Sequence, residues 1–244
     1  MYKPTFGWPS VSILIPYFNR KRFEKLIQYN LEQQSYPNIC EVIIADDSDQ
    51  PGQRLQLDLS CTITYMCLAR CTIGHKRNVL KSRAHGDICV HMDSDDCYAP
   101  GYVATVVRTL LNHPKGKVTG SSDMLFVNPL TGYRGYQSCI YMNQINEASQ
   151  AYWSEYGRTH FFLDQSHAEN GSFVPDVSII VDCPIHDIMV CTIHGTNTID
   201  KSPWEAPQYA NKLPMWFYRG QYLTLLKNIE LRTAGTPNGE LSKQ

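Results

Sequence analysis

The chain has 244 residues, a hydrophobic content of 43% and a formal net charge of −1. This length and apolar content are enough to form a core, and we expect one globular domain. Positive and negative charges nearly cancel, and there is no long basic or acidic block. The composition therefore disfavours nucleic acid as the main partner and a charge-driven membrane surface.

Cysteine usage and hydropathy bear on the compartment. The nine cysteines form no Cys-x-x-Cys pair, and such an odd, unpatterned set fits a reducing environment better than a disulfide framework. The N-terminus lacks an apolar signal region, and no run of about 18 apolar residues could span a bilayer. We expect a cytoplasmic protein without a transmembrane segment, either free or peripheral at a membrane surface.

The first hundred residues alternate between short apolar runs and helical patterns. Such alternation is typical of an α/β fold with a parallel sheet. We expect Pro16 to end the first strand, because proline interrupts a strand ladder. In chain order the expected elements are a strand at 11–15, a helix at 22–34, strands at 41–45 and 63–69, a helix at 76–84, a strand at 88–92 and a helix between Pro100 and Pro114.

The later residues have a different character. The expected elements there are a hairpin of 124–127 with 133–141, an aromatic-rich stretch at 152–162, strands at 178–181 and 188–193, and a closing helix at 222–231. This change divides the expected domain into about 10–125 and about 126–232. Residues 233–244 are expected to be a tail or linker.

Carboxylates follow the expected strands. Asp93-Ser-Asp-Asp96 places three carboxylates within four residues, and a further acidic cluster at 46–49 follows the second strand. Such a cluster repels itself unless a cation is present, and Mg²⁺ or Mn²⁺ bridges protein carboxylates to substrate phosphates. Ligands of parallel sheets bind at the carboxyl ends of the strands. The sequence thus indicates metal-assisted chemistry on a phosphorylated substrate.

Five segments in a fixed order resemble the family 2 nucleotide-sugar glycosyltransferases, which share the GT-A fold. These segments are 11–20, 41–48, 74–78, 86–88 and 93–96, with weaker similarity at 162–173 and 194–198. The resemblance implies an α/β GT-A domain with a mostly parallel mixed sheet flanked by helices. In this interpretation about 10–125 is the nucleotide-binding half and about 126–232 is the smaller acceptor half. The resemblance also implies sugar transfer from a nucleotide sugar to a hydroxyl of a glycan or glycoconjugate.

The resemblance assigns residues to the donor. Pro16 and Tyr17 line the base pocket, and Asp47 accepts a hydrogen bond from the imide N–H of uracil, which favours a UDP-sugar over a dTDP-sugar. Asp46 is either a strand-end cap or a ribose contact. The other implied donor positions are Asn19, Arg20, Gly74, Arg77 and Ser94, whereas His75 and Lys76 are expected at the surface.

The resemblance also implies a Mn²⁺ or Mg²⁺ site. Asp95 ligates the ion that bridges the two phosphates, and Asp93 contacts ribose or the water shell of the ion. His194 completes the metal site or contacts the diphosphate, since imidazole is a suitable Mn²⁺ ligand. Asp96 is either a second ligand or an acidic residue at a helix N-terminus.

The catalytic base is the point at which the sequence departs from the family. The family places an acidic residue at the end of a Glu-Asp pair, but this chain reads Glu169-Asn170, and an amide cannot act as a base. We expect Glu169 as the base, Asp164 as the second candidate, and an inverting mechanism. A retaining route through a phosphate oxygen of the donor stays open. Trp153 is the expected acceptor contact.

Two other functions compete with this interpretation. A sugar nucleotidyltransferase would carry a glycine-rich loop after the first strand, but 16–20 contains no glycine. A non-catalytic glycan- or nucleotide-binding module would explain Asn170. The carboxylates retained at 93–96 argue against that second alternative.

Overall fold

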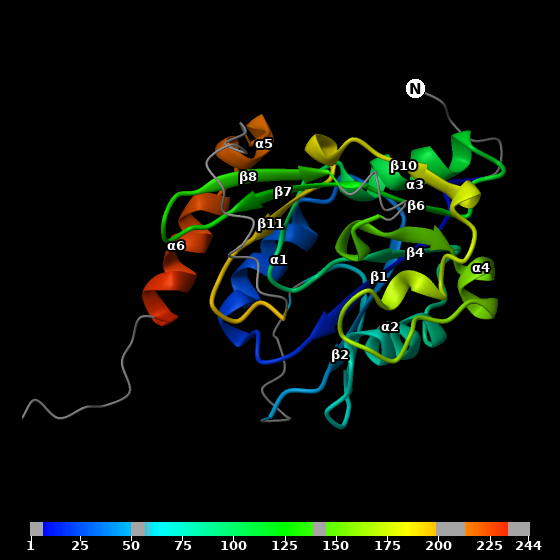
Figure 1. Ribbon diagram of the computed structural model, residues 1–244, viewed down its shortest axis with the longest axis horizontal. Coiled ribbons are helices and arrows are strands. Elements are labelled where there is room, and N and C mark those ends of the chain that lie inside the picture. The colour runs from blue at the N-terminus through cyan, green and yellow to red at the C-terminus, as the bar shows by residue number, and fades with distance from the viewer. Residues whose placement is uncertain (1–6, 50–56, 58, 139–144, 199–212, 234–244) are drawn as a thin grey trace, which may run out of the picture.

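The computed structural model describes residues 7–49, 57, 59–138, 145–198 and 213–233 (Figure 1). Its larger sheet has seven strands in the order β10-β6-β9-β4-β1-β2-β3. Neighbouring strands are parallel except that β9 runs antiparallel to β4 and β6. The strands are β1 (Val11–Tyr17), β2 (Ile39–Asp46), β3 (Thr62–Cys67), β4 (Ile88–His91), β6 (Val118–Gly120), β9 (Ala151–Trp153) and β10 (Ile180–Asp182).

Helices cover both faces of this sheet (Figure 1). These helices are α1 (Glu24–Glu32), α2 (Ile73–Ser82), α3 (Tyr102–Asn112) and α4 (Ser154–Thr159). Two further helices, α5 (Met215–Arg219) and α6 (Tyr222–Thr233), lie farther from this sheet, and α6 packs on α1. Short 3₁₀ turns are η1 (Lys21–Phe23), η3 (Glu147–Ser149), η4 (Glu169–Gly171), η5 (Val177–Ile179) and η6 (Ile185–Asp187). The expected alternation of strands and helices in the first hundred residues is confirmed.

The two core clusters follow the period of two along each strand. In β1, Ile13 and Ile15 belong to the larger cluster, to which α1, α3 and α6 contribute, whereas Leu14 belongs to the smaller one with Leu80 of α2. All of these side chains are fully buried. Because successive side chains of a strand point to opposite faces, a sheet covered on both faces needs apolar residues at nearly every position. This explains the uninterrupted apolar runs in the sequence.

A second sheet has four strands in the order β5-β11-β7-β8. Its strands are β5 (Cys97–Tyr98), β7 (Asp123–Val127), β8 (Arg134–Ser138) and β11 (Met189–Thr192), and β7 with β8 forms the expected hairpin. Each sheet contains strands from both sides of the boundary that we expected near residue 125. β5 joins this later sheet, while β9 and β10 join the first sheet.

The first strand runs past Pro16, contrary to expectation, and ends at Tyr17. Pairing with β4 stops at Leu14 and His91, whereas pairing with β2 continues to Tyr17. Leu14 accepts a hydrogen bond from the Met92 N–H, so the backbone polar groups of Leu14 point toward β4. The backbone of Pro16, two positions on, faces the same side, where β4 has already ended. The missing N–H of proline therefore costs no ladder bond.

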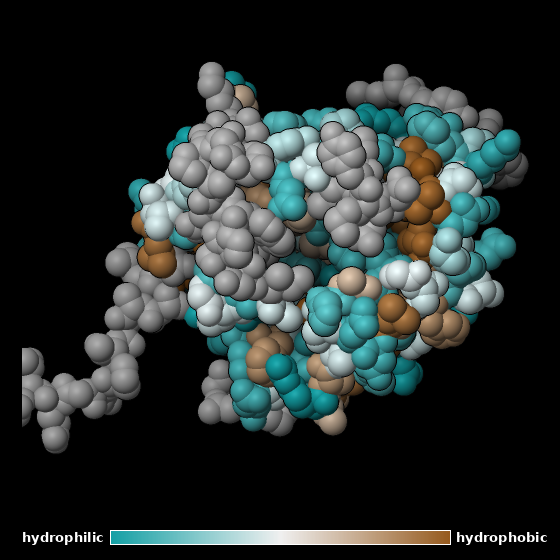
Figure 2. Space-filling model, in the orientation of Figure 1, coloured by the Kyte–Doolittle hydropathy of each residue, from teal (hydrophilic) through white to brown (hydrophobic). Residues whose placement is uncertain are grey.

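In the described part of the chain, no helix has both the length and the apolar character needed to cross a membrane. Figure 2 shows that hydrophilic and neutral residues make up most of the visible described surface, with apolar residues in small separate groups.

Candidate active site

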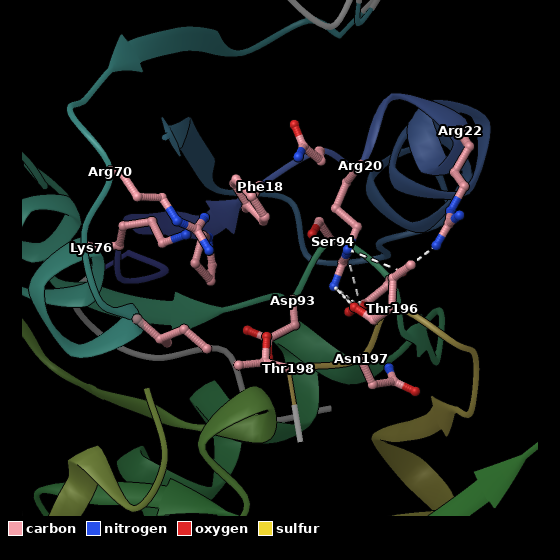
Figure 3. A pocket seen from close by; sticks show the side chains of 14 residues that line it. Phe18, Arg20, Arg22, Arg70, Lys76, Asp93, Ser94, Thr196, Asn197 and Thr198 are labelled. Atoms are coloured by element: carbon pink, nitrogen blue, oxygen red, sulfur yellow. Dashed lines mark hydrogen bonds and ion pairs between the residues drawn. The ribbon is translucent and has the colours of Figure 1, made fainter. Parts of the chain in front are cut away.

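A cleft of about 570 Å³ lies at the carboxyl ends of β1 and β4. Loops that follow these strands meet there with the α2 region and with the segment after β11 (Figure 3). The lining residues are Pro16, Phe18, Asn19, Arg20, Arg22, Arg70, Ile73, Lys76, Asp93, Ser94, Asp95, Thr196, Asn197 and Thr198. The cleft therefore joins the expected base-binding loop to the acidic turn.

An aromatic ring and two cations form one end of the cleft. The Arg70 guanidinium carbon lies 3.4 Å from the centre of the Phe18 ring, and Lys76 Nζ lies 5.7 Å from it. Figure 3 shows these three side chains together, apart from the Arg20 end. A flat ring beside cations is suited to stack a nucleobase.

Asp47 lies behind this end, with its carboxylate fully buried. Oδ1 accepts a hydrogen bond from Lys76 Nζ at 2.6 Å, and Oδ2 accepts the Cys71 N–H at 3.0 Å and an Arg70 N–H at 3.4 Å. Lys76 was expected at the surface, but it is only 4% exposed because it neutralises this carboxylate. His75, by contrast, is exposed as expected.

Tyr17 and Asp46 point away from the cleft. The Tyr17 ring is 2% exposed and packs in the larger core cluster, so Phe18 rather than Tyr17 lines the cleft beside Pro16. Asp46 accepts hydrogen bonds from Ser48 N–H at 2.8 Å and from the hydroxyls of Ser48 and Tyr65. These contacts give Asp46 the strand-end cap role, one of the two expected for it.

Asp95 and His194 meet at the other end of the cleft. His194 Nε2 lies 3.0 Å from Asp95 Oδ2, and the same oxygen accepts Arg20 Nε–H at 3.1 Å. Arg20 Nη2 is 3.0 Å from that oxygen and also donates to the Thr196 carbonyl at 2.9 Å. The expected metal ligands are thus brought together, with a guanidinium beside them.

Pairing of β5 with β11 produces this arrangement. Tyr98 lies opposite Met189, so β11 runs past the acidic turn. The Thr192 N–H donates to Asp96 Oδ1 at 2.8 Å, and the Thr192 hydroxyl donates to the Asp95 carbonyl. Asp96 is therefore an anchor for β11, which differs from both roles expected for it. His194, two residues later, arrives beside Asp95.

The residues present fit a divalent cation that is shared with a substrate. Among the described residues, no group of three or more His, Cys, Asp or Glu side chains is arranged to hold a metal ion. Asp95 and His194 nevertheless supply a carboxylate oxygen and an imidazole nitrogen 3.0 Å apart. Mg²⁺ and Mn²⁺ commonly take only one or two protein carboxylates, with water and phosphate oxygens as the other ligands.

Asn19 and Ser94 shape the middle of the cleft. Asn19 has a φ of 51°, a left-handed conformation that asparagine tolerates. Its N–H donates to Ser48 Oγ at 2.7 Å, and its Nδ2 donates to Asp49 at 2.7 Å. The loop after β1 is thereby fixed to the loop after β2. Ser94 is 5% exposed and lines the cleft.

Arg77 is buried behind Asp93, in the middle of α2, and is not among the residues that line the cleft. Its Nε donates to Glu169 Oε1 at 3.0 Å, and its Nη2 donates to Asp93 Oδ1 at 3.2 Å. Burial disfavours the charge, but the two carboxylates outweigh that cost and raise the pKa of Arg77. Arg77 thus joins two other candidate site residues, and its direct contact with a donor stays a prediction.

The two candidate bases lie in different environments. Glu169 is 4% exposed and begins η4, where it pairs with Arg77. Asp164 is exposed and accepts a hydrogen bond from the Thr72 hydroxyl. Asn170 accepts Gln150 Nε2–H at 3.0 Å and is 6% exposed. Only Glu169 is linked, through Arg77, to the acidic turn.

Glu147 is a site carboxylate that the sequence analysis missed. It is half-buried in η3, just before β9, close enough to Glu169, Arg77 and Asp93 for their charges to act on it. Burial first, and then the negative charge of Glu169, raise the pKa of Glu147 to about 7. No sequence motif marks Glu147; β9 brings it to the carboxyl end of β4 by inserting antiparallel between β4 and β6.

Gly74, an implied donor position, lies inside α2, one residue after its start, and is not among the residues that line the cleft. A Cβ there would lie 1.8 Å from the Leu163 carbonyl oxygen, and the Gly74 N–H donates to Gln165 at 3.0 Å. Glycine is required for this close approach. It seats the segment that leads to Glu169 against α2.

Trp153 does not join the other candidate residues. It pairs with Ile88, the first residue of β4, whereas the acidic turn follows the last. Trp153 lines a separate groove of about 530 Å³ together with Leu110, Lys117 and Tyr156 among others. The antiparallel direction of β9 puts Gln150 and Glu147 at the site edge and Trp153 at the opposite edge.

Comparison with known proteins agrees with this fold. The family model described as Glycosyl transferase family 2 matches residues 12–172, about two thirds of the chain. The chain belongs to glycosyl transferase family 2, and the expected resemblance is confirmed.

Solved structures of low sequence identity share the GT-A fold. The mannosyltransferase PcManGT from Pyrobaculum calidifontis, in complex with GDP-Man and Mn²⁺, matches with a TM-score of 0.59 and 17% identity, over 95% of this chain and 72% of that chain. S. aureus TarS 1-349 in complex with UDP matches with a TM-score of 0.56 and 18% identity, over 75% and 60% of the two chains. At such identities the likeness concerns the fold.

A curated relative covers a smaller region. It is an uncharacterized glycosyltransferase of Haemophilus influenzae, 29% identical over 107 residues, which are 43% of this chain and 35% of the relative. The chain thus matches about a third of the length of that protein.

Proposed function

We propose that this protein is a metal-dependent glycosyltransferase that moves a sugar from a UDP-sugar to a hydroxyl of a glycan or glycoconjugate. The observation that carries the proposal is the single cleft with two unlike ends. One end offers Phe18 and Arg70, and the other offers Asp95 with His194 beside Arg20. A nucleotide sugar has matching ends, a flat base and an anionic diphosphate.

The nucleobase of the donor is proposed to stack on Phe18 and to donate its ring N–H to Asp47. Arg70 holds Asp47 Oδ2 with the longest of the three contacts, 3.4 Å, and its side chain is 61% exposed. Oδ2 is thus the oxygen that a base can gain when Arg70 turns away. Uracil and guanine both present a ring N–H, whereas cytosine presents an acceptor, so the carboxylate would select against cytosine.

The diphosphate is proposed to lie between Arg20 and Asp95. A guanidinium pairs with phosphate oxygens in a bidentate way, which suits Arg20 in the loop after β1. A bound Mn²⁺ or Mg²⁺ would be held by Asp95 and His194, and it would act as a Lewis acid for the charge of the departing diphosphate. Asp93, held by Arg77, is proposed to contact ribose or the water shell of the ion.

In the proposed inverting transfer, the acceptor hydroxyl oxygen attacks C1 of the sugar. The bond from C1 to the phosphate oxygen breaks, UDP leaves with the electron pair, and the hydroxyl proton moves to the base. Glu169 is the leading base because Arg77 fixes its carboxylate at 3.0 Å. Glu147 and then Asp164 are the alternatives, and a base must come within hydrogen-bond reach of the acceptor oxygen.

The test measures the release of the nucleoside diphosphate from each donor together with the affinity for free nucleoside diphosphates. UDP-glucose, UDP-N-acetylglucosamine, UDP-galactose and GDP-mannose are incubated with the protein and Mn²⁺, with and without EDTA. Calorimetry measures the affinity for UDP, GDP and CDP. We expect release from a UDP-sugar that requires the metal, and the weakest binding for CDP. Binding without any release would favour the non-catalytic module that Asn170 suggests, and no affinity for UDP would contradict the proposal.

Glutamine substitutions then identify the base. Glu169→Gln is expected to abolish transfer and spare UDP affinity, while Glu147→Gln and Asp164→Asn keep transfer. The anomeric configuration of the product, determined by NMR, separates inversion from retention. Full activity of Glu169→Gln would exclude Glu169.

A further inference from the structure

Arg77 has a protein partner at each of its three side-chain nitrogens. Nε binds Glu169 at 3.0 Å, Nη2 binds Asp93 at 3.2 Å, and Nη1 lies 3.0 Å from Nδ1 of His91. The side chain is 2% exposed. A guanidinium held at all three nitrogens has a single orientation, so the third partner also contributes to fixing it.

His91 is that third partner, and its ring is completely buried at the end of β4. Burial first, and then the charge of Arg77, hold the pKa of His91 well below its ordinary value of 6.5, so the ring is neutral. Arg77 can only donate, which requires Nδ1 to accept. Nε2 then carries the proton and faces the Tyr152 hydroxyl oxygen at 3.3 Å.

One other group competes for the same nitrogen. The Glu147 carbonyl oxygen lies 3.0 Å from His91 Nδ1, and it would need a proton on that nitrogen. Such a proton would point at the Nη1–H groups of a buried cation. Hydrogen bonds from charged donors are about twice as strong as neutral ones, so the contact with Arg77 decides the tautomer.

Aromatic packing prevents the His91 ring from turning away. Tyr152 packs edge-on with ring centroids 5.5 Å apart, and Phe162 packs at 5.5 Å on a tilted plane. Phe162 is also fixed to α2, because its N–H donates to Asn78 Oδ1 at 3.0 Å. The acceptor nitrogen is therefore held in place before any substrate binds.

We propose that His91 is a positioning residue of the transferase, which fixes Glu169 relative to Asp93 by holding the Arg77 guanidinium between them. This inference rests on the proposed function, in which Asp93 serves the donor and Glu169 serves the acceptor. Without an acceptor at the place of Nδ1, Arg77 Nη1 has no partner there and the guanidinium shifts. Asp93 and Glu169 then lose their fixed separation. The end of the cleft at Phe18 and Arg70, where the nucleobase is proposed to bind, is unchanged.

Two substitutions at the same position make the test specific. His91→Leu keeps the apolar volume and removes the acceptor, whereas His91→Asn places an amide oxygen near the position of Nδ1. For His91→Leu we expect kcat to fall at least about tenfold, with the donor KM and UDP affinity within about twofold of wild type. His91→Asn should recover most of kcat. Unfolding midpoints of both variants are measured alongside.

Two results would overturn the inference. One is an equal loss of kcat in His91→Leu and His91→Asn that is matched by an equal loss of stability. That result would mean that the His91 side chain only supports the fold. The other is a ring ¹⁵N NMR spectrum, assigned by comparison with His91→Asn, that shows a protonated Nδ1. The NMR measurement needs no activity, so a wild-type protein that releases UDP from no donor would refute the proposed function while the His91 contact is still tested.

Discussion

His194 and Asp95 are 99 positions apart in the sequence, yet Nε2 of one lies 3.0 Å from Oδ2 of the other. The approach depends on the short strand β5, whose pairing with β11 brings the later segment alongside the acidic turn. Thr196 N–H donates to His194 Nδ1 at 3.3 Å, so Nδ1 is occupied by the backbone and Nε2 is the nitrogen that faces Asp95.

This pair leads to a prediction about metal-linked nucleotide binding. Asp95→Asn is expected to weaken UDP binding in the presence of Mn²⁺ at least about tenfold, or about 1.4 kcal/mol, because a neutral amide is a poor ligand for a hard cation. Without metal, wild type and variant should bind UDP alike. Calorimetry with Mn²⁺ and with EDTA checks this, and Asp187→Asn, at an exposed position in η6, is the control. Equal affinities under both conditions would remove Asp95 from the metal site.

Phe18 lines the cleft in place of Tyr17, and this difference from the expected base pocket is testable. Phe18→Ala should weaken UDP binding by about 1–3 kcal/mol, the usual value of a base stacked on an aromatic ring. Tyr17→Phe should leave UDP affinity unchanged, because the Tyr17 ring lies in the core. Titration of both variants with UDP measures the difference. A loss for Tyr17→Phe as large as that for Phe18→Ala would contradict the assignment.

Gly74 should not tolerate a methyl group. Gly74→Ala is expected to lower the free energy of unfolding by about 1–3 kcal/mol, the usual cost of overpacking, because its Cβ would meet the Leu163 carbonyl. Gly101→Ala is the matched control, since the nearest atom to its Cβ is 4.0 Å away. Denaturant unfolding measures both. Equal stabilities of the two variants would show that the 163–165 segment can move aside.

Glu147 should make stability depend on pH. Its pKa is raised from 4.5 to about 7 in the folded protein, so the fold binds this proton more tightly than the unfolded chain does. The resulting stabilisation is complete below pH about 4.5 and is lost as pH rises to about 7 and beyond.

Replacing Glu147 tests this dependence. Relative to wild type, Glu147→Gln should gain on the order of 2 kcal/mol of unfolding free energy between pH 5 and pH 8, since one pKa unit is about 1.4 kcal/mol. Urea unfolding at both pH values checks the gain, with Glu155→Gln at an exposed position of α4 as the control. Stability differences that stay constant with pH would count against a shifted Glu147.

Local features of the sequence were enough for much of the fold. Apolar runs and helical periods are properties of neighbouring residues, and they predicted β1, β2, β4 and the helices between them. The acidic turn was equally visible, because clustered charges at the end of a buried strand need an external partner. Phe18 was within reach of the same reasoning. With side chains alternating, a strand that continues through Pro16 puts Tyr17 on the face of Ile13 and Ile15, and Phe18 outside.

Other features depended on pairs of residues that the sequence keeps far apart. Lys76 is buried because it pairs with Asp47, which directly follows β2. Arg77 is buried because it pairs with both Asp93 and Glu169. Glu147 and Trp153 lie at opposite edges of the larger sheet because β9 runs antiparallel to β4. The sequence determined which residues are apolar, charged or able to turn. The tertiary structure decided which charges face each other, since an ion pair depends on distance in space and is independent of distance along the chain.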